Sequence, residues 1–169
     1  LYVAPAGTPL PDDVDEPLNA AFKSLGYDVS VLADADAEDQ FSMADAAALV
    51  KLGVSVHMWT DKLSVEERAF QDLPWDSVLF SLKLAQGELG FAVNDQVRFK
   101  FQEALEQDIG RWAEDARLRT AIGVAAKKGG WFKDTTRGDQ WFKVVSPAFD
   151  DAAFSKKDLA VKLEALWTW

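Results

Sequence analysis

Short runs in which apolar and polar residues alternate recur along this chain, and this period of two constrains the fold more than any other feature. The clearest run puts Val78, Phe80, Leu82 and Leu84 on one face of an extended segment, and Ser81 and Lys83 on the other. Similar runs predict strands over residues 27–32, 54–59, 91–93, 97–102, 131–132, 141–145 and 159–165. Half-buried strands of this kind form antiparallel sheets with one solvated face.

The apolar period becomes helical in one long segment. Leu105, Ile109, Trp112 and Ala116 recur every three or four residues, which predicts an amphipathic helix over residues 103–126, ended by Gly129 and Gly130. Shorter helices are expected over residues 18–25, near residues 42–48 and over residues 65–71, where Ser64 and Glu67 have capping-box spacing. The predicted fold is therefore α+β: a mainly antiparallel β-sandwich or open barrel of about seven strands with one flanking helix.

The expected domain organisation is an extended N-terminal arm, residues 1–17, followed by a single α+β domain, residues 18–169. Pro5, Gly7, Pro9 and Pro11 prevent regular structure in the arm. Hydrophobic residues make up 49% of the chain, which is enough for a core. The chain contains no cysteine, so disulfides and cysteine-based metal or redox chemistry are excluded. No apolar run is long enough to span a bilayer, and no secretory signal is visible.

Acidic residues are concentrated in the first part of the chain. Residues 1–72 hold 14 Asp and Glu against four Lys and Arg, whereas residues 73–169 hold 14 of each sign, so the net charge of −10 comes from the first segment. Such a field repels nucleic acid and cannot bind it without a metal ion. We therefore expect a protein that keeps polyanions at a distance or that meets a basic partner.

The motifs of common enzyme classes are missing from the sequence. His57 is the only histidine, and its alternation with Val56 and Met58 predicts the outer face of a strand rather than a general base. The sequence contains no G-x-S-x-G, no G-x-x-x-x-G-K-[ST] and no G-x-G-x-x-G. It therefore lacks the signature motifs of serine hydrolases, P-loop NTPases and Rossmann dehydrogenases. We therefore predict that the chain is not an enzyme.

Carboxylates form two patterns that could bind a metal ion or perform catalysis. Asp34, Asp36 and Glu38 have calcium-loop spacing and Asp45 falls at the twelfth position, but Asp39 occupies the position of the required glycine. This departure favours a solvated acidic loop. The neighbouring pairs Asp12–Asp13, Glu114–Asp115 and Asp150–Asp151 point apart and do not predict a glycosidase site. No metal and no cofactor is predicted.

A basic and aromatic stretch near the C-terminus has two interpretations. Trp131, Phe132, Trp141 and Phe142 lie close in sequence to Lys127, Lys128, Lys133, Arg137 and Lys143. Interleaved aromatic and basic residues can bind single-stranded nucleic acid. A pair of strands with an apolar inner face and a charged edge has the same pattern, and we favour this structural interpretation. The stretch could also complement the acidic segment in a second copy, which would allow head-to-tail stacking.

The N-terminal residues resemble a known family. The run Leu1–Tyr2–Val3–Ala4–Pro5–Ala6–Gly7–Thr8–Pro9–Leu10–Pro11, followed by Leu18–Asn19–Ala20–Ala21–Phe22–Lys23–Ser24–Leu25–Gly26–Tyr27 and an acidic loop, resembles the opening of the major tail (tail tube) proteins of long-tailed, non-contractile bacteriophages. The specific part covers about 30 residues. Residues 54–70 and 158–166 match only as a pattern of elements, and the long helix and Trp-rich end depart from the family.

The resemblance implies a structural virion protein that self-assembles into stacked, hexameric rings. The rings would form a phage tail tube that conducts genomic DNA without binding it specifically, with tape measure and tail terminator proteins as further partners and no membrane. Location in the virion, and in the host cytoplasm during assembly, would follow. The subunit interface would include Leu1, Tyr2, Val3, Pro5, Pro9, Asp34, Asp36, Glu38, Asp39 and Phe41.

Two other function classes remain open. The chain could be a monomeric acidic binding or inhibitor module that docks a basic protein partner through residues 28–48. It could also be an enzyme that uses carboxylates or a bound metal ion, which would require a clustered acid pair in a cleft. Size in solution separates the first alternative from a tail tube, because a binding module would remain a compact monomer or dimer.

Overall fold

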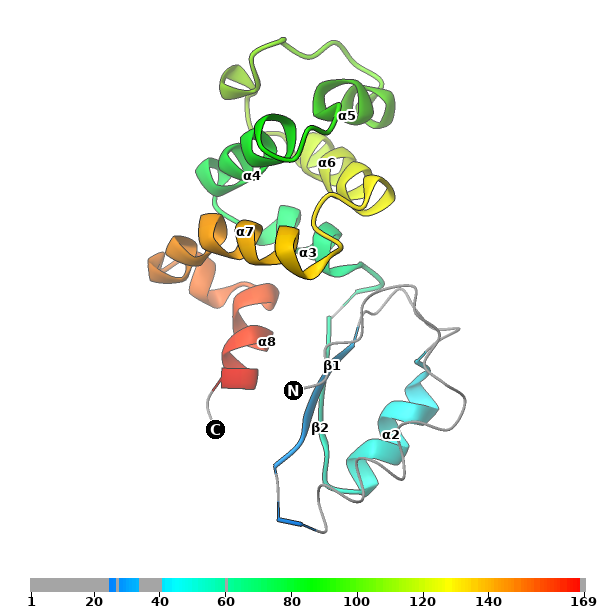
Figure 1. The fold of residues 1–169 in the computed structure, drawn as a ribbon. Helices are drawn as coiled ribbons and strands as arrows, with labels where there is room; N and C mark the ends of the chain where they lie inside the picture. The colour runs from blue at the N-terminus through cyan, green and yellow to red at the C-terminus, as the bar shows by residue number, and fades with distance from the viewer. Residues whose placement is uncertain (1–24, 27, 34–40, 60, 168–169) are drawn as a thin grey trace. The chain divides into compact units, whose positions relative to one another are not determined.

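The structure, a computed structural model, describes residues 25–26, 28–33, 41–59 and 61–167, and these residues are mostly helical (Figure 1). The chain divides into two compact units. The first unit comprises residues 1–64 and 162–169, and the second comprises residues 65–161. Across the described ranges, every helix is too short or too polar to cross a membrane.

The described part of the first unit is a β-α-β arrangement. Strand β1 (Ser30–Ala33) pairs in parallel with β2 (Ser55–Met58), and helix α2 (Met43–Lys51) connects them (Figure 1). Parallel neighbours cannot be joined by a tight hairpin and need such a crossover. After α2 the chain turns at Gly53, whose φ of 78° lies in the left-handed region that favours glycine.

The second unit is built from helices. Its elements are α3 (Val65–Asp72), α4 (Trp75–Gly87), α5 (Val93–Phe101), η1 (Ile109–Arg111), α6 (Ala116–Gly129), α7 (Thr135–Val145), η2 (Ser146–Asp150) and η3 (Phe154–Lys156). Helix α8 (Asp158–Trp167) begins in this unit, and its residues from 162 onward belong to the first. Helices α3 and α5 pack against α6, and α4 packs against α7 (Figure 1). Helix α6 is therefore central to the packing.

An aromatic cluster forms the core of the second unit. Trp131 is fully buried and meets the ring of Phe70 edge-on, with 6.5 Å between centroids. Phe132 and Trp141 stack at 4.3 Å with an interplanar angle of 12°. The indole N–H of Trp131 donates to Oε1 of Gln96 at 2.7 Å, which satisfies its one polar atom. Trp131 and Phe132 are core residues, so the structure places them where bases cannot stack on them.

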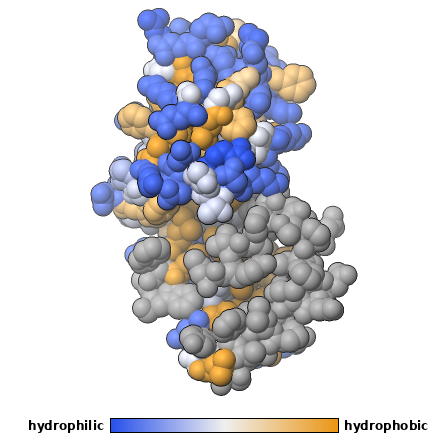
Figure 2. Space-filling view, in the orientation of Figure 1, coloured by the Kyte–Doolittle hydropathy of each residue, from blue (hydrophilic) through white to orange (hydrophobic). Residues whose placement is uncertain are grey.

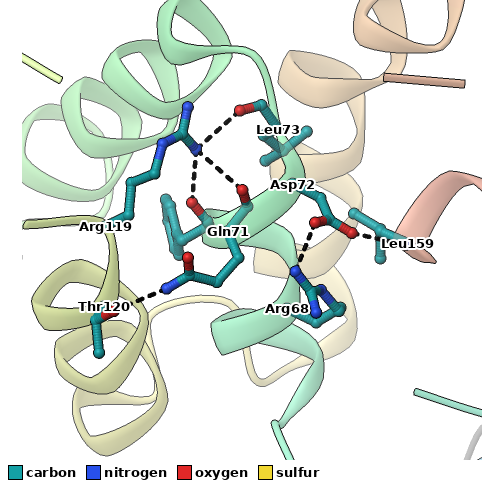
Figure 3. A network of polar contacts seen from close by, with 8 residues as sticks. Arg68, Gln71, Asp72, Leu73, Arg119, Thr120 and Leu159 are labelled. Carbon is teal, nitrogen blue, oxygen red and sulfur yellow. Dashed lines mark hydrogen bonds and ion pairs between the residues drawn. The ribbon is translucent and has the colours of Figure 1, made fainter. Parts of the chain in front are cut away.

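A buried arginine organises the end of α3. Arg119, in the first half of α6, donates from Nη1 to the carbonyl oxygens of Phe70 at 2.7 Å and Leu73 at 2.9 Å (Figure 3). Its Nε and Nη2 donate to Oε1 of Glu114 at 2.8 and 2.6 Å, and its guanidinium lies 5.3 Å from the ring centroid of Trp75. The last carbonyl groups of a helix have no partner within the helix, and Arg119 supplies one.

A second buried charge extends this network. Asp72, the last residue of α3, accepts a hydrogen bond from Nη2 of Arg68 at 2.6 Å and one from the backbone N–H of Leu159 at 2.8 Å (Figure 3). Leu159 lies in the first turn of α8, whose N–H groups lack partners inside the helix. Asp72 therefore fixes the start of α8 against the end of α3.

The predicted β-sandwich is wrong. The described residues contain two short parallel strands, β1 and β2, and seven α-helices, α2 to α8. The strands predicted over residues 78–84, 97–102, 141–145 and 159–165 fall on helices α4, α5, α7 and α8, and the strand predicted over residues 91–93 is replaced by the two residues before α5 and the first residue of that helix. Trp131 and Phe132 follow α6 in a turn rather than in a strand.

Exposed hydrophobic residues explain the error. In α4 the fully buried residues Val78 and Leu82 are four apart, as a helix requires, whereas Phe80 between them is 58% exposed. In α5, Val97 is fully buried and Phe99 is 76% exposed. Each exposed side chain falls two residues from a buried one and so produced a false period of two.

Other elements were predicted correctly or in part. The strands at residues 27–32 and 54–59 and the helix at residues 65–71 are confirmed as β1, β2 and α3, and α2 begins after Ser42. The helix predicted over residues 103–126 is present only from Ala116 as α6, and it ends where predicted because Gly130 caps it with a φ of 59°. Residues 103–115 hold a loop and η1.

Replacement of Arg119 tests its role in the second unit. In Arg119→Met the carbonyl groups of Phe70 and Leu73 lose their donor in a buried site, so we expect the free energy of unfolding to fall by about 3–5 kcal/mol. Urea denaturation followed by tryptophan fluorescence measures this change. Arg117→Met is the control, since Arg117 lies on the same helix with a 67% exposed side chain paired to Glu103. We expect it to cost less than about 1 kcal/mol; equal costs would contradict the assignment.

Candidate functional site

The carboxyl ends of β1 and β2 meet at one edge of the first unit. The register pairs Ala33, the last residue of β1, with Met58, the last residue of β2. The chain therefore leaves both strands at this edge, which we call the carboxyl edge. Trp59 is buried directly after β2, and Asp61 is exposed two residues later. In sequence, Asp34 follows β1 immediately, and Asp36, Glu38 and Asp39 come next.

The N-terminus of α2 is closed by a reciprocal cap. The backbone N–H and the hydroxyl of Ser42 donate to Oδ2 of Asp45 at 2.7 and 2.6 Å, and the backbone N–H of Asp45 donates to Oγ of Ser42 at 3.2 Å. Hydrogen bonds from the side chain and then the backbone of Ser42 lower the pKa of the Asp45 carboxyl. Asp45 therefore serves the helix cap, and the calcium-loop pattern that would use it as the twelfth ligand follows a strand rather than a helix.

The proposed interface residues fall almost entirely outside the described residues. Those outside are Leu1, Tyr2, Val3, Pro5, Pro9, Asp34, Asp36, Glu38 and Asp39, together with the predicted arm, residues 1–17. Phe41 is described: it is half-buried and directly precedes the cap residue Ser42. The structure therefore places one of the ten interface residues, beside the start of α2.

His57 is half-buried on β2 rather than on an outer face. Its Nε2 atom is buried and has no hydrogen-bonding partner among the residues that the structure describes. Burial, with a smaller contribution from the positive charge of Lys162, lowers the pKa of the imidazole below its usual value. The ring is therefore neutral at neutral pH and adds no charge to the first unit.

Glu66 is a buried carboxylate that sequence reasoning missed. It lies in the first turn of α3 and is 6% exposed, and no hydrogen-bonding partner of its carboxylate is found within the described ranges. A negative charge near a helix N-terminus is stabilised by the helix dipole. The sequence gives no signal for the burial of Glu66, because Glu66 and Glu67 are adjacent residues of the same type. In the structure they differ, since Glu67 forms an ion pair with Lys127 at 3.3 Å.

Neither a metal centre nor a known relative defines the site. Within residues 25–26, 28–33, 41–59 and 61–167, no group of three or more His, Asp or Glu side chains could hold a metal ion. Comparison with protein-family models, curated proteins and solved structures found no match. The carboxyl edge, with the acidic residues that follow β1 in sequence, is the best candidate site.

The Ser42–Asp45 cap makes the first unit sensitive to acid. Because the folded pKa of Asp45 is lowered, its stabilising effect is complete above the unfolded value of about 3.8 and is lost as pH falls below it. We expect Asp45→Asn to melt at a lower temperature than the wild type at pH 7, and the difference to shrink as pH falls towards 3. Circular dichroism melts at several pH values measure this; a constant difference would argue against the cap.

Proposed function

We propose that the first unit binds a divalent cation through Asp34 and Asp36 at the carboxyl edge, and through this cation holds a phosphate group of its ligand. The observation that carries the proposal is the parallel pairing of β1 and β2. In open parallel sheets, ligands bind outside the carboxyl ends of the strands. Asp34 is the first residue after β1, and Asp36 follows two residues later.

The residue types at this edge suit a hard cation. Mg²⁺ binds through one or two carboxylates, keeps several water molecules and completes its coordination with phosphate oxygens. Asp34 and Asp36 are two residues apart in the sequence, which is the spacing that calcium-binding loops use for successive ligands. Asp45 is not among the proposed ligands, because its carboxylate accepts the hydrogen bonds of the Ser42 cap.

The charge of the first segment explains why a cation is needed. The first unit holds 12 Asp and Glu against four Lys and Arg, so a phosphate group approaching the carboxyl edge without a cation would be repelled. A bound divalent ion reverses the local sign and attracts phosphate oxygens. It also polarises the phosphoryl group, which is the effect that metal-dependent cleavage of phosphate esters uses. The proposal thus departs from the sequence-based prediction that the chain is not an enzyme.

The tail-tube function stays a prediction of the N-terminal resemblance. The β-sandwich expected for its rings is replaced by helices across the described residues, so this function has lost its architectural support. The acidic binding module also stays a hypothesis, supported by charge alone. Light scattering coupled to size exclusion tests both. We expect a small species, and rings or tubes of many copies would favour the tail-tube function instead.

Cation binding is the direct test of the proposal. We expect the wild type to bind Mn²⁺, and the double variant Asp34→Asn and Asp36→Asn to bind it at least about tenfold more weakly. Electron paramagnetic resonance of free Mn²⁺ measures the affinity. A nucleotide monophosphate then serves as the phosphate probe, and its binding should require the cation. Hydrolysis of a phosphodiester substrate in the same buffer reports whether the bound ion is catalytic.

The matched control neutralises the other end of the same strand. Asp28 precedes β1, so Asp28→Asn removes one negative charge, half of what the double variant removes, at the opposite end of the strand from the carboxyl edge. We expect this control to bind Mn²⁺ like the wild type. Loss of affinity in the control would attribute binding to overall charge, and unchanged affinity in the folded double variant would exclude Asp34 and Asp36 as ligands.

A further inference from the structure

The last turn of α5 carries the most exposed aromatic ring of the second unit (Figure 1). Phe99 is 76% exposed, more than any other large hydrophobic residue in the described ranges. The Nζ atom of Lys100 lies 4.9 Å from the centroid of its ring. Single exposed apolar residues are common on protein surfaces, so the surroundings of Phe99 decide whether its ring can bind a ligand.

An open depression lies beside Phe99. Its volume of about 560 Å³ falls in the range of small-molecule sites. It is lined by Asp95, Arg98, Phe99, Gln102, Glu103 and Ala104. Lys100 lines a second, smaller depression instead, so its ammonium group does not stand between the ring and the first depression. In Figure 2 the visible face of this unit is mostly hydrophilic with separate hydrophobic patches, which suits a ligand that has an apolar face and polar edges.

Gln102 is shared by the two depressions. It ends α5 with a φ of 62° and is the one non-glycine residue with a positive φ across the described ranges. Its backbone N–H donates to the carbonyl oxygen of Arg98 at 2.9 Å. This left-handed conformation favours glycine, so a glutamine adopts it at a conformational cost. The cost places beside the ring of Phe99 an amide that can both donate and accept hydrogen bonds.

The charged residues of the first depression leave donors for an anion. Arg98 donates from Nη2 to Oδ1 of Asp95 at 3.1 Å, which is its one side-chain hydrogen bond to a described residue. A guanidinium has five N–H donors, so Arg98 keeps most of them for a ligand. Glu103 pairs with Arg117 at 2.6 Å. Both carboxylates at the depression therefore have a cationic partner, which reduces the repulsion that an anionic ligand would meet.

We propose that this depression binds a nucleotide, with the base stacked on the ring of Phe99 and the phosphate bound by Arg98. A base has a flat aromatic face, and bases of any sequence stack on exposed aromatic side chains. The edge of the base carries donors and acceptors that the amide of Gln102 can meet. The planar guanidinium of Arg98 suits bidentate binding of a phosphate group. The nucleotide site does not depend on the cation site proposed for the first unit.

Calorimetry with a nucleoside monophosphate in EDTA tests the nucleotide site on the whole 169-residue chain, without the cation proposed for the first unit. We expect Phe99→Leu, which keeps an apolar side chain and removes the ring, to weaken binding by at least about fivefold. Phe99→Trp keeps a stacking face and should bind at least as tightly as the wild type.

The matched control is Phe80→Leu. Phe80 is also an exposed phenylalanine with a lysine over its ring, Lys83 at 5.9 Å, but it lines neither depression, so we expect wild-type affinity. Circular dichroism verifies that the variants fold. Equal monophosphate affinity in the wild type and in Phe99→Leu, or the same loss in Phe80→Leu, would overturn the proposal.

Substitution of Arg98 separates the phosphate contact from the base contact. We expect Arg98→Gln to weaken binding of the monophosphate by about tenfold and to leave binding of the corresponding nucleoside unchanged. Arg111→Gln is the control, since Arg111 lies on η1 with a 71% exposed side chain and lines neither depression. An equal loss for nucleoside and monophosphate in Arg98→Gln would contradict the phosphate contact.

A second arm of the experiment identifies the source of the nucleotide. A short single-stranded oligonucleotide is titrated in fluorescence anisotropy beside the monophosphate. Oligonucleotide binding that weakens in Phe99→Leu assigns the site to an unpaired nucleotide within a strand. Monophosphate binding without oligonucleotide binding assigns it to a free nucleotide. Binding of neither probe at millimolar concentration, or oligonucleotide binding that Phe99→Leu leaves unchanged in the absence of monophosphate binding, overturns the proposal.

Discussion

The hydrogen bonds from Arg119 to the carboxyl end of α3 are the contact on which the helical unit depends. They place a buried guanidinium where three groups converge: the carbonyl oxygens of Phe70 and Leu73, and the carboxylate of Glu114. A buried charge is tolerated only when its donors are used, and here Nε, Nη1 and Nη2 all have acceptors. The position of α3 against α6 is therefore fixed by geometry as well as by apolar burial.

Residues next to this contact on α3 also hold the other helices of the unit. Phe70, held by its carbonyl group, presents its ring to Trp131 and Trp141, so the loop after α6 and the helix α7 pack on α3. Asp72, two residues later, binds the backbone of Leu159 and sets the start of α8. One short helix thus carries both the aromatic core and the polar network, and α3 is also the helix that the sequence predicted correctly.

The sequence could predict the elements whose local signals agree. The strands β1 and β2 and the helix α3 have a clear period and, for α3, a capping residue, whereas α4 and α5 carry exposed Phe80 and Phe99 that imitate a strand. The sequence pattern did not predict the relative direction of the two strands. Alternation does not record whether a partner runs parallel or antiparallel, and the crossover through α2 decides it. Burial of Arg119 and of Glu66 had no local signal at all.

The parallel pairing of β1 and β2 also changes how the acidic residues after β1 are interpreted. In an antiparallel sandwich, acidic residues after a strand are expected to be solvated loop charges, whereas in a parallel sheet the residues that follow a strand in sequence, as Asp34 and Asp36 follow β1, are candidates for ligand binding. The charge of the two units differs in the same sense. The first unit holds 12 Asp and Glu against four Lys and Arg, and the second holds 16 against 14. The acidic excess of the chain therefore lies mainly in the unit for which we propose a cation site, where it would attract a divalent ion and repel a phosphate group that comes without one.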